Sequence, residues 1–597
     1  MRRAIAALLL VGPGVALGCT TLLAGPGATV DGSVLVSHSN DADGEGAGNL
    51  QVVKAADWPP NATVSGIPQV AHTYAYHTEA YAAMNEHQVG LGESTCPAAF
   101  NGSGGGAMLD IVALSDIGLQ RARTAREAIL TMGALAERCG EHTLAMCGGC
   151  AVVTRPCPLS RGRYGFRGDG TFEGSGESLM VADPTEGWIF HILPDAAGGS
   201  AIWCASRIPD DHVAVVANAF AIRQVRVADR GSDVLFSDSM LRTAAAMGWW
   251  GPGQPTLDFA AHFGGATPEP SHYYSGRRMW AVYRLLAPSA HFRSHNSKLH
   301  VDSNFSTSAR PDAKVQLGSF FRVMRDYFEG TEFDLTQGLA AGPFGTPDRW
   351  RAGAAEAAVG GAWERPIALY RTRISYVLQL RAWLPAAVGG VVWTAPHAAH
   401  TSCYVPFAVG MGSIPASHSN SSAGMVDMST AFWLSRALFN RAQEAFRYMI
   451  VDIRTAQEEA EATSRAAQAA IDAAFVASRN LTAASAAYAS NAAQVMRALA
   501  ALFDSLLDKY PDGYCNSCGR GLPHHLGYPA WWLRAVNYSH GVAPVAQPQP
   551  VAEGGAAGCT RARCLAIDGA GEFERCVRGC FSGQGHPGAT PRLSFSG

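Results

Sequence analysis

Residues 19–41 read CTTLLAGPGATVDGSVLVSHSND, which is two runs of β-prone residues on either side of a Gly- and Asp-containing turn. The first run begins at Cys19, and the dipeptide Asp31-Gly32 between the runs is a strong hairpin signal. The stretch therefore predicts an antiparallel hairpin whose first strand starts at a cysteine.

The residues before Cys19 have the composition of a secretory leader. Two arginines precede an apolar run over residues 4–11, and small residues stand at Ala16 and Gly18, where a signal peptidase reads its site. A Gly-Pro-Gly sequence breaks the run before it reaches the about 20 apolar residues that span a bilayer, so we predict a signal peptide over residues 1–18. A bacterial lipoprotein with a lipid on Cys19 is the less favoured alternative. Lipoprotein signals usually have Leu at the position where this chain has Ala16.

Size and charge limit the classes of function. The chain has 597 residues, of which 48% are hydrophobic, so it can bury a sizeable core in several modules or in one large domain with insertions. Its 46 Lys and Arg nearly balance 49 Asp and Glu, and no basic stripe alternates with aromatic residues. The charge pattern therefore argues against a nucleic-acid partner. No later segment is long and apolar enough to span a membrane.

Cysteine content and glycosylation sequons suggest the compartment. The chain has 14 cysteines, a number that suits an oxidising environment in which disulfides persist. Asn-X-Ser/Thr sequons occur at Asn61, Asn101, Asn304, Asn420, Asn480 and Asn537. With the leader, these features predict a glycoprotein that is secreted or enters a lysosomal or vacuolar lumen.

Later segments alternate between strand and helix patterns. Strand pairs are predicted over residues 82–95, 177–220 and 383–410, a helix pair over 113–140, and long helices over 430–507, which contain no Gly or Pro. Glu458, Glu459 and Glu461 in the last segment are interpreted as a solvated helix face. The order of these patterns predicts an α+β fold.

Composition also predicts the domain boundaries. We expect the leader over residues 1–18, one main domain over 19–535 with its long helices at 430–507, and a linker with a cysteine-rich tail over 536–597.

The leader junction suggests a chemical use for Cys19. Cleavage after Gly18 would give this residue both a thiol, with a pKa of about 8.5, and a free α-amine, with a pKa of about 7.7–8.0. The amine would take the thiol proton and later return a proton to the leaving amine, as in covalent acyl transfer. The alternative is a disulfide-bonded cysteine near the mature terminus.

The surrounding motifs resemble a known family. They are CTTLLAGPGATVDGSVLVSHSND, MNEHQVGLGEST, SDIGLQRARTAREAILTMGALAERCG, ESLMVADPTEGWIFHIL, SRIPDDHVAVVANAF and GGVVWTAPHAAHTSCYVPF. Together, from Cys19 to about Leu533, they resemble the dipeptidase A family of cysteine peptidases, which includes the secernins and belongs to the N-terminal-nucleophile hydrolases. The resemblance implies a four-layer αββα sandwich, here with additional C-terminal helices, and hydrolysis of amide bonds in dipeptides.

The resemblance also implies catalytic roles. Cys19 matches the family's nucleophile, Asp41 the acidic residue that orients the α-amine, and Asn218 the asparagine whose amide helps form an oxyanion hole. His38 stands where related cysteine hydrolases have Arg and secernins Lys. It would stabilise a thiolate when protonated, or donate one hydrogen bond when neutral.

Three further residues are candidates for substrate binding. Asn85 and Glu93 lie in the family's NE-x-x-V-x-x-x-E pattern, and Glu93 is the candidate partner of a substrate ammonium. The alternative for both is a turn and a buried, paired carboxylate. Arg207 would bind a substrate carboxylate through its planar fork, or form a surface ion pair with Asp210 or Asp211.

Other motifs predict no cofactor. Cys147 and Cys150 have the spacing of a thioredoxin motif but lack its βαβ context. Four possible zinc ligands occur at Cys515, Cys518, His524 and His525, but their spacing is too short for a usual zinc finger. A disulfide between the two cysteines is the favoured interpretation. We therefore predict no metal, nucleotide or organic cofactor. The alternative functions are a secernin-like protein with little peptidase activity and an acyl-amide hydrolase.

Overall fold

The computed structural model describes residues 18–41, 46–64, 66–100, 109–137, 176–196, 200–265, 272–295, 304–350, 364–519 and 523–538. Most of the predicted leader, the Cys147/Cys150 pair and the cysteine-rich tail lie outside these residues. The chain divides into two units, residues 1–349 with 364–529, and residues 350–363 with 530–597. The described part of the second unit contains the short helix α13 (Ala530–Ala535), whereas both large sheets belong to the first unit.

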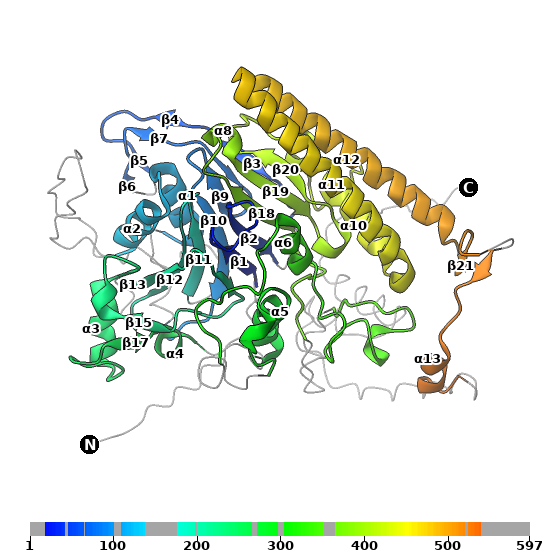
Figure 1. Ribbon diagram of the computed structural model, residues 1–597, viewed down its shortest axis with the longest axis horizontal. Coiled ribbons are helices and arrows are strands. Elements are labelled where there is room, and N and C mark those ends of the chain that lie inside the picture. Colours follow the sequence, from blue (N-terminus) through cyan, green and yellow to red (C-terminus); the bar gives the residue numbers. More distant parts are fainter. Residues whose placement is uncertain are drawn as a thin grey trace, which may run out of the picture. The chain divides into compact units, whose positions relative to one another are not determined.

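The predicted hairpin forms the middle of a six-stranded antiparallel sheet (Figure 1). Its strands, in spatial order, are β14 (Val213–Val216), β1 (Thr20–Ala24), β2 (Val34–Asn40), β18 (Ile374–Leu380), β19 (Gly390–Pro396) and β20 (Val405–Ala408). The connection between β1 and β2 contains Gly32, whose φ of 79° is left-handed. Asp31 Oδ1 accepts from the backbone N–H of Ser33 at 3.0 Å. The hairpin prediction is confirmed, with a longer loop than a two-residue turn.

The second large sheet has eight antiparallel strands. In spatial order these are β16 (Val234–Phe236), β13 (Ala201–Ile208), β12 (Gly187–Pro194), β11 (Gly176–Ala182), β10 (Gly90–Cys96), β9 (Ala82–Asn85), β8 (Tyr76–Thr78) and β3 (Gln51–Val53). Smaller pairs join β4 (Ala56–Asp57) to β7 (His72–Thr73), β5 (Thr63–Val64) to β6 (Ile67–Pro68), and β15 (Gln224–Arg226) to β17 (Thr256–Asp258).

The two large sheets pack against each other, with β10 facing β1 and β2. Side chains of β11 alternate between two hydrophobic cores: Met180 and Ala182 join the core between the sheets, and Leu179 and Val181 join the core under the helices. Both faces of the eight-stranded sheet are therefore covered, which explains why its central strands are apolar at almost every position.

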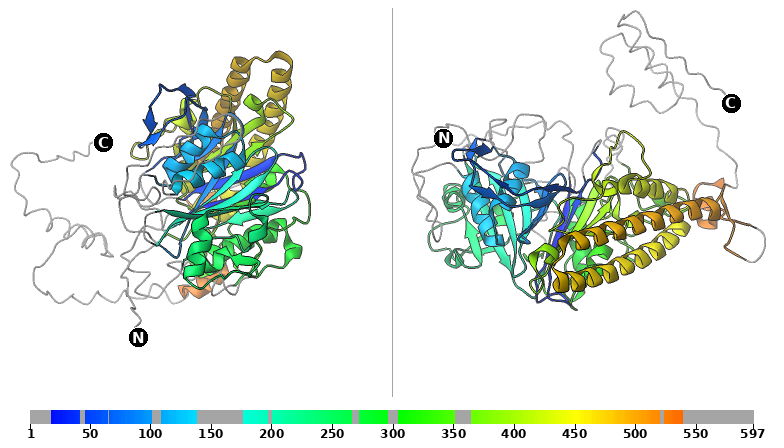
Figure 2. Two further views of the ribbon diagram at one scale, coloured as in Figure 1. Left: turned by 90° about the vertical axis from the view of Figure 1, so that its left-hand side faces the viewer. Right: turned by 90° about the horizontal axis from the view of Figure 1, so that it is seen from above.

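Helices cover the outer sides of the paired sheets (Figure 2). Next to the eight-stranded sheet lie α1 (Ile111–Arg121), α2 (Ala125–Ala136) and α3 (Asp238–Ala246). Next to the six-stranded sheet lie α5 (Arg277–Leu286), α6 (Leu317–Met324), α8 (Ala386–Gly389), α10 (Ala431–Ala442), α11 (Phe446–Ser478) and α12 (Leu481–Lys509). The remaining short helices are α4 (Phe259–Phe263) and α9 (Ala416–Ser419).

These elements confirm an α+β fold with large antiparallel sheets and long C-terminal helices. The predicted helix pair divides because Thr124 accepts a hydrogen bond from the backbone N–H of Glu127 and so caps the second helix. In the described ranges, no helix has the length and apolarity needed to cross a membrane.

The interpretation of the glutamate cluster on α11 is wrong for one of its three members. Glu458 and Glu459 are exposed, but Glu461 is only 4% exposed and pairs with Arg325. Its carboxylate also accepts the backbone N–H of Tyr404 at 3.0 Å. Because this face of α11 packs on the sheet, the charge is buried and paired rather than solvated.

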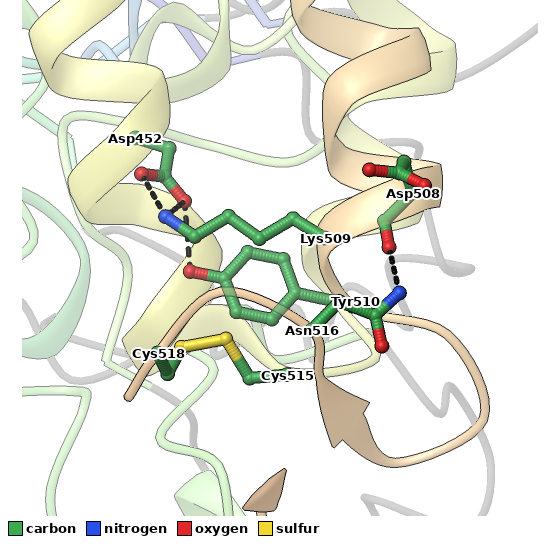
Figure 3. The surroundings of a disulfide bond; sticks show 7 residues. All are labelled: Asp452, Asp508, Lys509, Tyr510, Cys515, Asn516 and Cys518. Atoms are coloured by element: carbon green, nitrogen blue, oxygen red, sulfur yellow. Dashed lines mark hydrogen bonds and ion pairs between the residues drawn. A yellow bond between two sulfur atoms is a disulfide. The ribbon is translucent and has the colours of Figure 1, made fainter. Parts of the chain in front are cut away.

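The cysteines at the end of α12 form a disulfide rather than a zinc site. Cys515 is bonded to Cys518, next to the strand pair β21 (Tyr514–Cys515) and β22 (His524–His525) (Figure 3). Nearby, Lys509 Nζ lies 2.7 Å from Asp452 Oδ1 and ties the end of α12 to α11. The other described cysteines, Cys19, Cys96, Cys204 and Cys403, are free and buried.

Candidate active site

Cys19 immediately precedes β1 and is only 2% exposed. The pairing of Thr20 with Ser39 brings the start of β1 next to the end of β2, where Asp41 follows. The backbone carbonyl of Cys19 accepts hydrogen bonds from Ser94 Oγ at 3.2 Å and from Arg278 Nη1 at 2.8 Å. The free thiol is thus held where the two sheets and α5 meet.

One side of Cys19 is acidic. One ligand atom each of Cys19, His38 and Glu93 lie within 4.8 Å of one another, and all three side chains are buried. Glu93 Oε1 accepts from Thr95 Oγ1 at 2.9 Å, whereas its Oε2 has no hydrogen-bond partner. Behind His38, Nε2 lies 3.6 Å from Glu79 Oε1, which is an ion-pair distance rather than a hydrogen bond. Two carboxylates therefore face the imidazole.

The surroundings of His38 favour its protonated form. Burial alone would lower its pKa, but the contact with Glu79 and the negative charges of Glu93 and Glu79 raise the pKa above its ordinary value. His38 Nδ1 donates to the backbone carbonyl of Glu93 at 2.8 Å.

A second carboxylate that acts on Cys19 is buried and has several donors. Asp41 Oδ2 accepts from Arg365 Nη2 at 2.7 Å and from Ser39 Oγ at 3.0 Å. Its Oδ1 accepts from Thr372 Oγ1 at 2.5 Å. Asp41 is therefore fixed by three donors at the end of β2, and its charge is compensated by a guanidinium.

Asn218 joins two arginines rather than presenting a free amide. Its Oδ1 accepts from Arg278 Nη2 at 2.6 Å and from Arg365 Nη1 at 2.9 Å, while its Nδ2 donates to the Thr95 carbonyl at 2.6 Å. The backbone of Asn218 is left-handed, with φ of 54°. Burial and the neighbouring Arg365 lower the pKa of Arg278 to about 9, which leaves it charged at neutral pH.

The residue before Cys19 is closely surrounded by Arg365 and Tyr274. Arg365 Nη2 also donates to the carbonyl oxygen of Gly18. A side chain at position 18 would collide with the guanidinium of Arg365 and the hydroxyl of Tyr274, which belongs to the helical turn His272–Gly276. The Tyr274 hydroxyl is itself buried without a hydrogen-bond partner. Only glycine is compatible with this position as the structure stands.

The thiol is protonated in this arrangement. Burial, followed by the negative charges of Glu93 and Asp41, raises the pKa of Cys19 well above its ordinary value. A hydrogen bond from the backbone of Asp41 acts in the opposite direction without overcoming them. With an uncharged peptide nitrogen at Cys19, the sulfur is therefore a poor nucleophile.

Two predicted substrate-binding residues make their contacts elsewhere. Asn85 Nδ2 donates to the carbonyls of Leu119 and Ala122 at 2.8 and 2.7 Å, and its Oδ1 accepts from the backbone of the following turn. These bonds attach the β9–β10 turn to the end of α1. None of them reaches Cys19.

Arg207 forms ion pairs at the end of β13. Its Nη2 lies 2.5 Å from Asp210 Oδ1, and its Nε lies 3.1 Å from Glu186 Oε2. The structure thus brings together Cys19, Asp41, Asn218, His38 and Glu93, and leaves Asn85 and Arg207 outside this group.

Four residues of the group were not predicted from the sequence. They are Glu79, Tyr274, Arg278 and Arg365, which come from three separate segments. Lone charged residues carry no local pattern, and the segment that contains Tyr274 and Arg278 has no clear periodicity. Their partners lie up to 347 positions away in the chain, so only the tertiary fold reveals them.

The comparison with family models gives one match. The model described as peptidase family C69 matches residues 167–459, about half of the chain. The matched part contains Asn218, Arg278 and Arg365 but not Cys19.

Similar proteins extend over a larger part of the chain. "Probable dipeptidase" from Salmonella dublin is 22% identical over 422 residues, which cover 68% of this chain and 84% of that protein. "Probable dipeptidase A" from Streptococcus pyogenes serotype M3 (strain SSI-1) is 21% identical over 496 residues, 77% of this chain and 90% of its own. "Dipeptidase" from Bifidobacterium longum (strain NCC 2705) is 22% identical over 508 residues, which cover 76% of this chain and 83% of that protein.

Proposed function

The chain belongs to peptidase family C69, and from this premise we propose that it is a cysteine dipeptidase whose nucleophile is Cys19, exposed as the amino-terminal residue when the leader is removed. The observation that carries the proposal is the convergence of Asp41, His38, Glu93 and Arg365 on a free, buried thiol. The names of the similar proteins supply the substrate class, dipeptides.

Leader removal would change the charge next to the sulfur. The raised pKa of the thiol reflects burial and two carboxylates without a cation on its own backbone nitrogen. A new α-ammonium at Cys19 would offset those carboxylates and stabilise the thiolate, so the thiol pKa falls on processing. The leader thereby keeps the enzyme inactive.

The same amine supplies the proton transfers. In its neutral form it takes the thiol proton as the sulfur attacks the scissile carbonyl carbon, and it then gives a proton to the leaving amino group. The acyl-thioester that remains is hydrolysed by water, and the amine again accepts and returns the proton. Asp41, fixed by Arg365 and Thr372, holds the terminus in position.

Arg365 and Tyr274 are suited to the substrate's carbonyl oxygen. Both surround Gly18, and Arg365 already donates to a peptide carbonyl there. When Gly18 leaves, these donors become available to the oxyanion of the tetrahedral intermediate. Asn218, expected to donate to that oxyanion, would instead position the guanidinium through its Oδ1.

The acidic side is suited to the substrate ammonium. Glu93 Oε2 has no hydrogen-bond partner, and Glu79 lies beyond the imidazole of His38. A free dipeptide carries its ammonium on the acyl part, so this carboxylate would orient it with the scissile bond over the sulfur. Such a substrate carries two opposite charges, and both carboxylates and arginines lie in the group around Cys19.

The proposal also includes a superfamily and a cellular compartment. Two facing antiparallel sheets with helices on both outer sides agree with the αββα sandwich of N-terminal-nucleophile hydrolases. We assign the chain to that superfamily, and place it in the secreted or lysosome-like compartment to which the leader would direct it.

The proposal is tested on the purified mature chain. Amino-terminal sequencing should begin at Cys19, and the chain should hydrolyse dipeptides. Cys19→Ala should remove this activity, whereas Cys204→Ala, which deletes another buried free thiol, should keep it. Full activity in Cys19→Ala, or an active chain that retains residues before Cys19, would exclude the mechanism. Acyl amides tested in parallel separate a dipeptidase from an acyl-amide hydrolase, and inactivity on both classes supports the secernin-like alternative.

A further inference from the structure

We propose that Cys19, His38 and Glu93 form a binding site for one thiophilic divalent cation, with Zn²⁺ as the best match, and that the bound ion reversibly blocks the thiol. The site shares Cys19 with the proposed function but is assembled from side chains that bind metal independently of catalysis.

The three side chains have the donor types and the spacing of a zinc site. A thiol sulfur, an imidazole nitrogen and a carboxylate oxygen lie within 4.8 Å of one another. Zinc binds these donors at about 2.0–2.3 Å in tetrahedral geometry, so small side-chain movements would bring all three to one ion. A soft thiolate with an imidazole selects zinc over magnesium or calcium, which prefer oxygen ligands.

His38 is oriented as metal-binding histidines are. Its Nδ1 donates to the backbone carbonyl of Glu93 at 2.8 Å, which fixes the hydrogen on that nitrogen. A metal would replace the second proton of this imidazole at Nε2, which is buried without a hydrogen-bond partner. A backbone carbonyl behind the ring is a common second partner of zinc-bound histidine.

An unpartnered oxygen of Glu93 is a second indication that this site binds a cation. Its side chain is 1% exposed, and Oε2 has no hydrogen-bond partner although Oε1 is bonded to Thr95. A buried carboxylate oxygen without a donor is costly unless a ligand supplies the positive charge. A divalent cation between Glu93 and Cys19 would satisfy this oxygen.

The local charge also favours a cation. Glu93 and Glu79 both lie on this side of the sulfur, and Glu79 Oε1 is 3.6 Å from His38 Nε2. The arginines Arg278 and Arg365 are bound by Asn218 and Asp41, and within the described residues neither forms a hydrogen bond or ion pair with Glu93 or Glu79. In the mature chain proposed above, the α-amine of Cys19 would add a fourth ligand through a five-membered chelate.

Binding would stop catalysis by occupying the nucleophile. The metal displaces the thiol proton and takes the sulfur electron pair that would attack the carbonyl. Removal of the metal by a chelator returns the free thiol, so no covalent change is left behind.

The test uses Cd²⁺ as a spectroscopic substitute for Zn²⁺ on the purified full-length mature chain, kept under anaerobic conditions without added thiol so that the Cys515–Cys518 disulfide stays intact. Thiolate binding to Cd²⁺ produces an ultraviolet charge-transfer band, and the titration should saturate at one ion per chain. Zn²⁺ should displace Cd²⁺ and remove the band. Loss of a residue that only supports a metal ligand typically lowers metal affinity by about 10–100-fold, so loss of a ligand in His38→Ala or Glu93→Gln should weaken binding by at least that factor.

Matched variants make the result specific. Cys19→Ala and Cys19→Ser should both lose the band, while Cys204→Ala and a His524→Ala/His525→Ala double variant should keep it. Unchanged circular dichroism identifies the variants that are folded. A band that is absent from the starting protein, or that survives in folded Cys19→Ser, overturns the proposal. So does unaltered affinity in both His38→Ala and Glu93→Gln.

This readout separates the metal site from the dipeptidase proposal. A chain that binds Cd²⁺ through Cys19 but hydrolyses no dipeptide refutes only the proposed function. A chain that hydrolyses dipeptides but binds no metal at Cys19 refutes only the metal site.

Discussion

At the scale of single residues, the pKa of Cys19 is set by burial and by the neighbouring carboxylates. The carboxylates of Glu93 and Asp41 raise its pKa, and only the second of these is compensated by an arginine in direct contact. A thiol in such surroundings depends on a further positive charge to ionise. The α-ammonium of a newly exposed terminus is the charge that processing would supply.

The thiol should therefore change its pH profile on processing. Alkylation by iodoacetamide requires the thiolate, so its rate rises as pH passes through the thiol pKa. In a chain that retains Gly18 before Cys19, this rise should occur above the ordinary thiol pKa, because burial and the carboxylates raise it. In the mature chain it should move to lower pH. Mass spectrometry of labelled peptides separates Cys19 from the other buried thiols, and identical profiles for the two chains would contradict the proposed activation.

Arg365 offers a second prediction at this scale. Arg365→Gln keeps a hydrogen-bond donor but removes the charge and fork that contact Asp41, so kcat should fall by about 10²–10³ if the guanidinium stabilises the oxyanion. Arg207→Gln is the matched control, since its partly exposed ion pairs contribute about 0–1 kcal/mol. Measurement of kcat and KM on variants with normal thermal melting tests whether Arg365 stabilises the oxyanion. A change in KM alone would assign Arg365 to substrate binding instead.

At the scale of elements, α11 packs on the six-stranded sheet through a polar stripe. Its buried polar residues are Gln457, Glu461, Ser464, Gln468 and Asp472, which follow the helical repeat. Each end of the stripe is tied to the chain around β18 and β19: Gln457 Nε2 donates to the Ser402 carbonyl at 2.9 Å, and Asp472 pairs with Arg381 at 2.5 Å. The helix is therefore oriented by specific polar contacts as well as by hydrophobic burial.

Removal of one buried charge from this stripe should be costly. Glu461→Ala leaves the Arg325 guanidinium and the Tyr404 backbone N–H without their acceptor, so the free energy of unfolding should fall by about 3–5 kcal/mol. Glu459→Ala, two residues away on the exposed face of α11, should change it by about 0.5 kcal/mol or less. Denaturant unfolding of both variants measures the difference, and equal effects would mean that the pair contributes no net stability.

At the scale of the whole first unit, the site depends on how closely the two sheets approach. Gly92 on β10 faces β1 and β2, and a side chain there would lie 2.6 Å from the Ser37 carbonyl oxygen. The next residues, Glu93 and Ser94, contact His38 and the Cys19 carbonyl. The spacing of the sheets therefore sets the position of the acidic side relative to the thiol.

Gly92→Ala should consequently affect stability and activity together. Overpacking typically costs about 1–3 kcal/mol, and displacement of β10 should also lower kcat. Gly318→Ala is the control, because nothing lies within 4 Å of the added atom and alanine favours α6 by up to about 1 kcal/mol. Calorimetry and dipeptide kinetics on both variants check this, and a Gly92→Ala enzyme with unchanged melting and kcat would contradict the tight approach.

The sequence by itself determined the local structure of this protein. The alternation of residues 19–41 predicts the central hairpin, and the absence of Gly and Pro over residues 430–507 predicts the long helices, because both depend on near neighbours in the chain. Family motifs additionally placed Cys19, His38, Asp41, Glu93 and Asn218 among the candidate residues. The tertiary structure alone decided which of these candidates meet, since Arg365 contacts Asp41 and Asn218 from distant segments. It also decided that Glu461 is buried, because the burial of a charge depends on what packs against it and not on its own side chain.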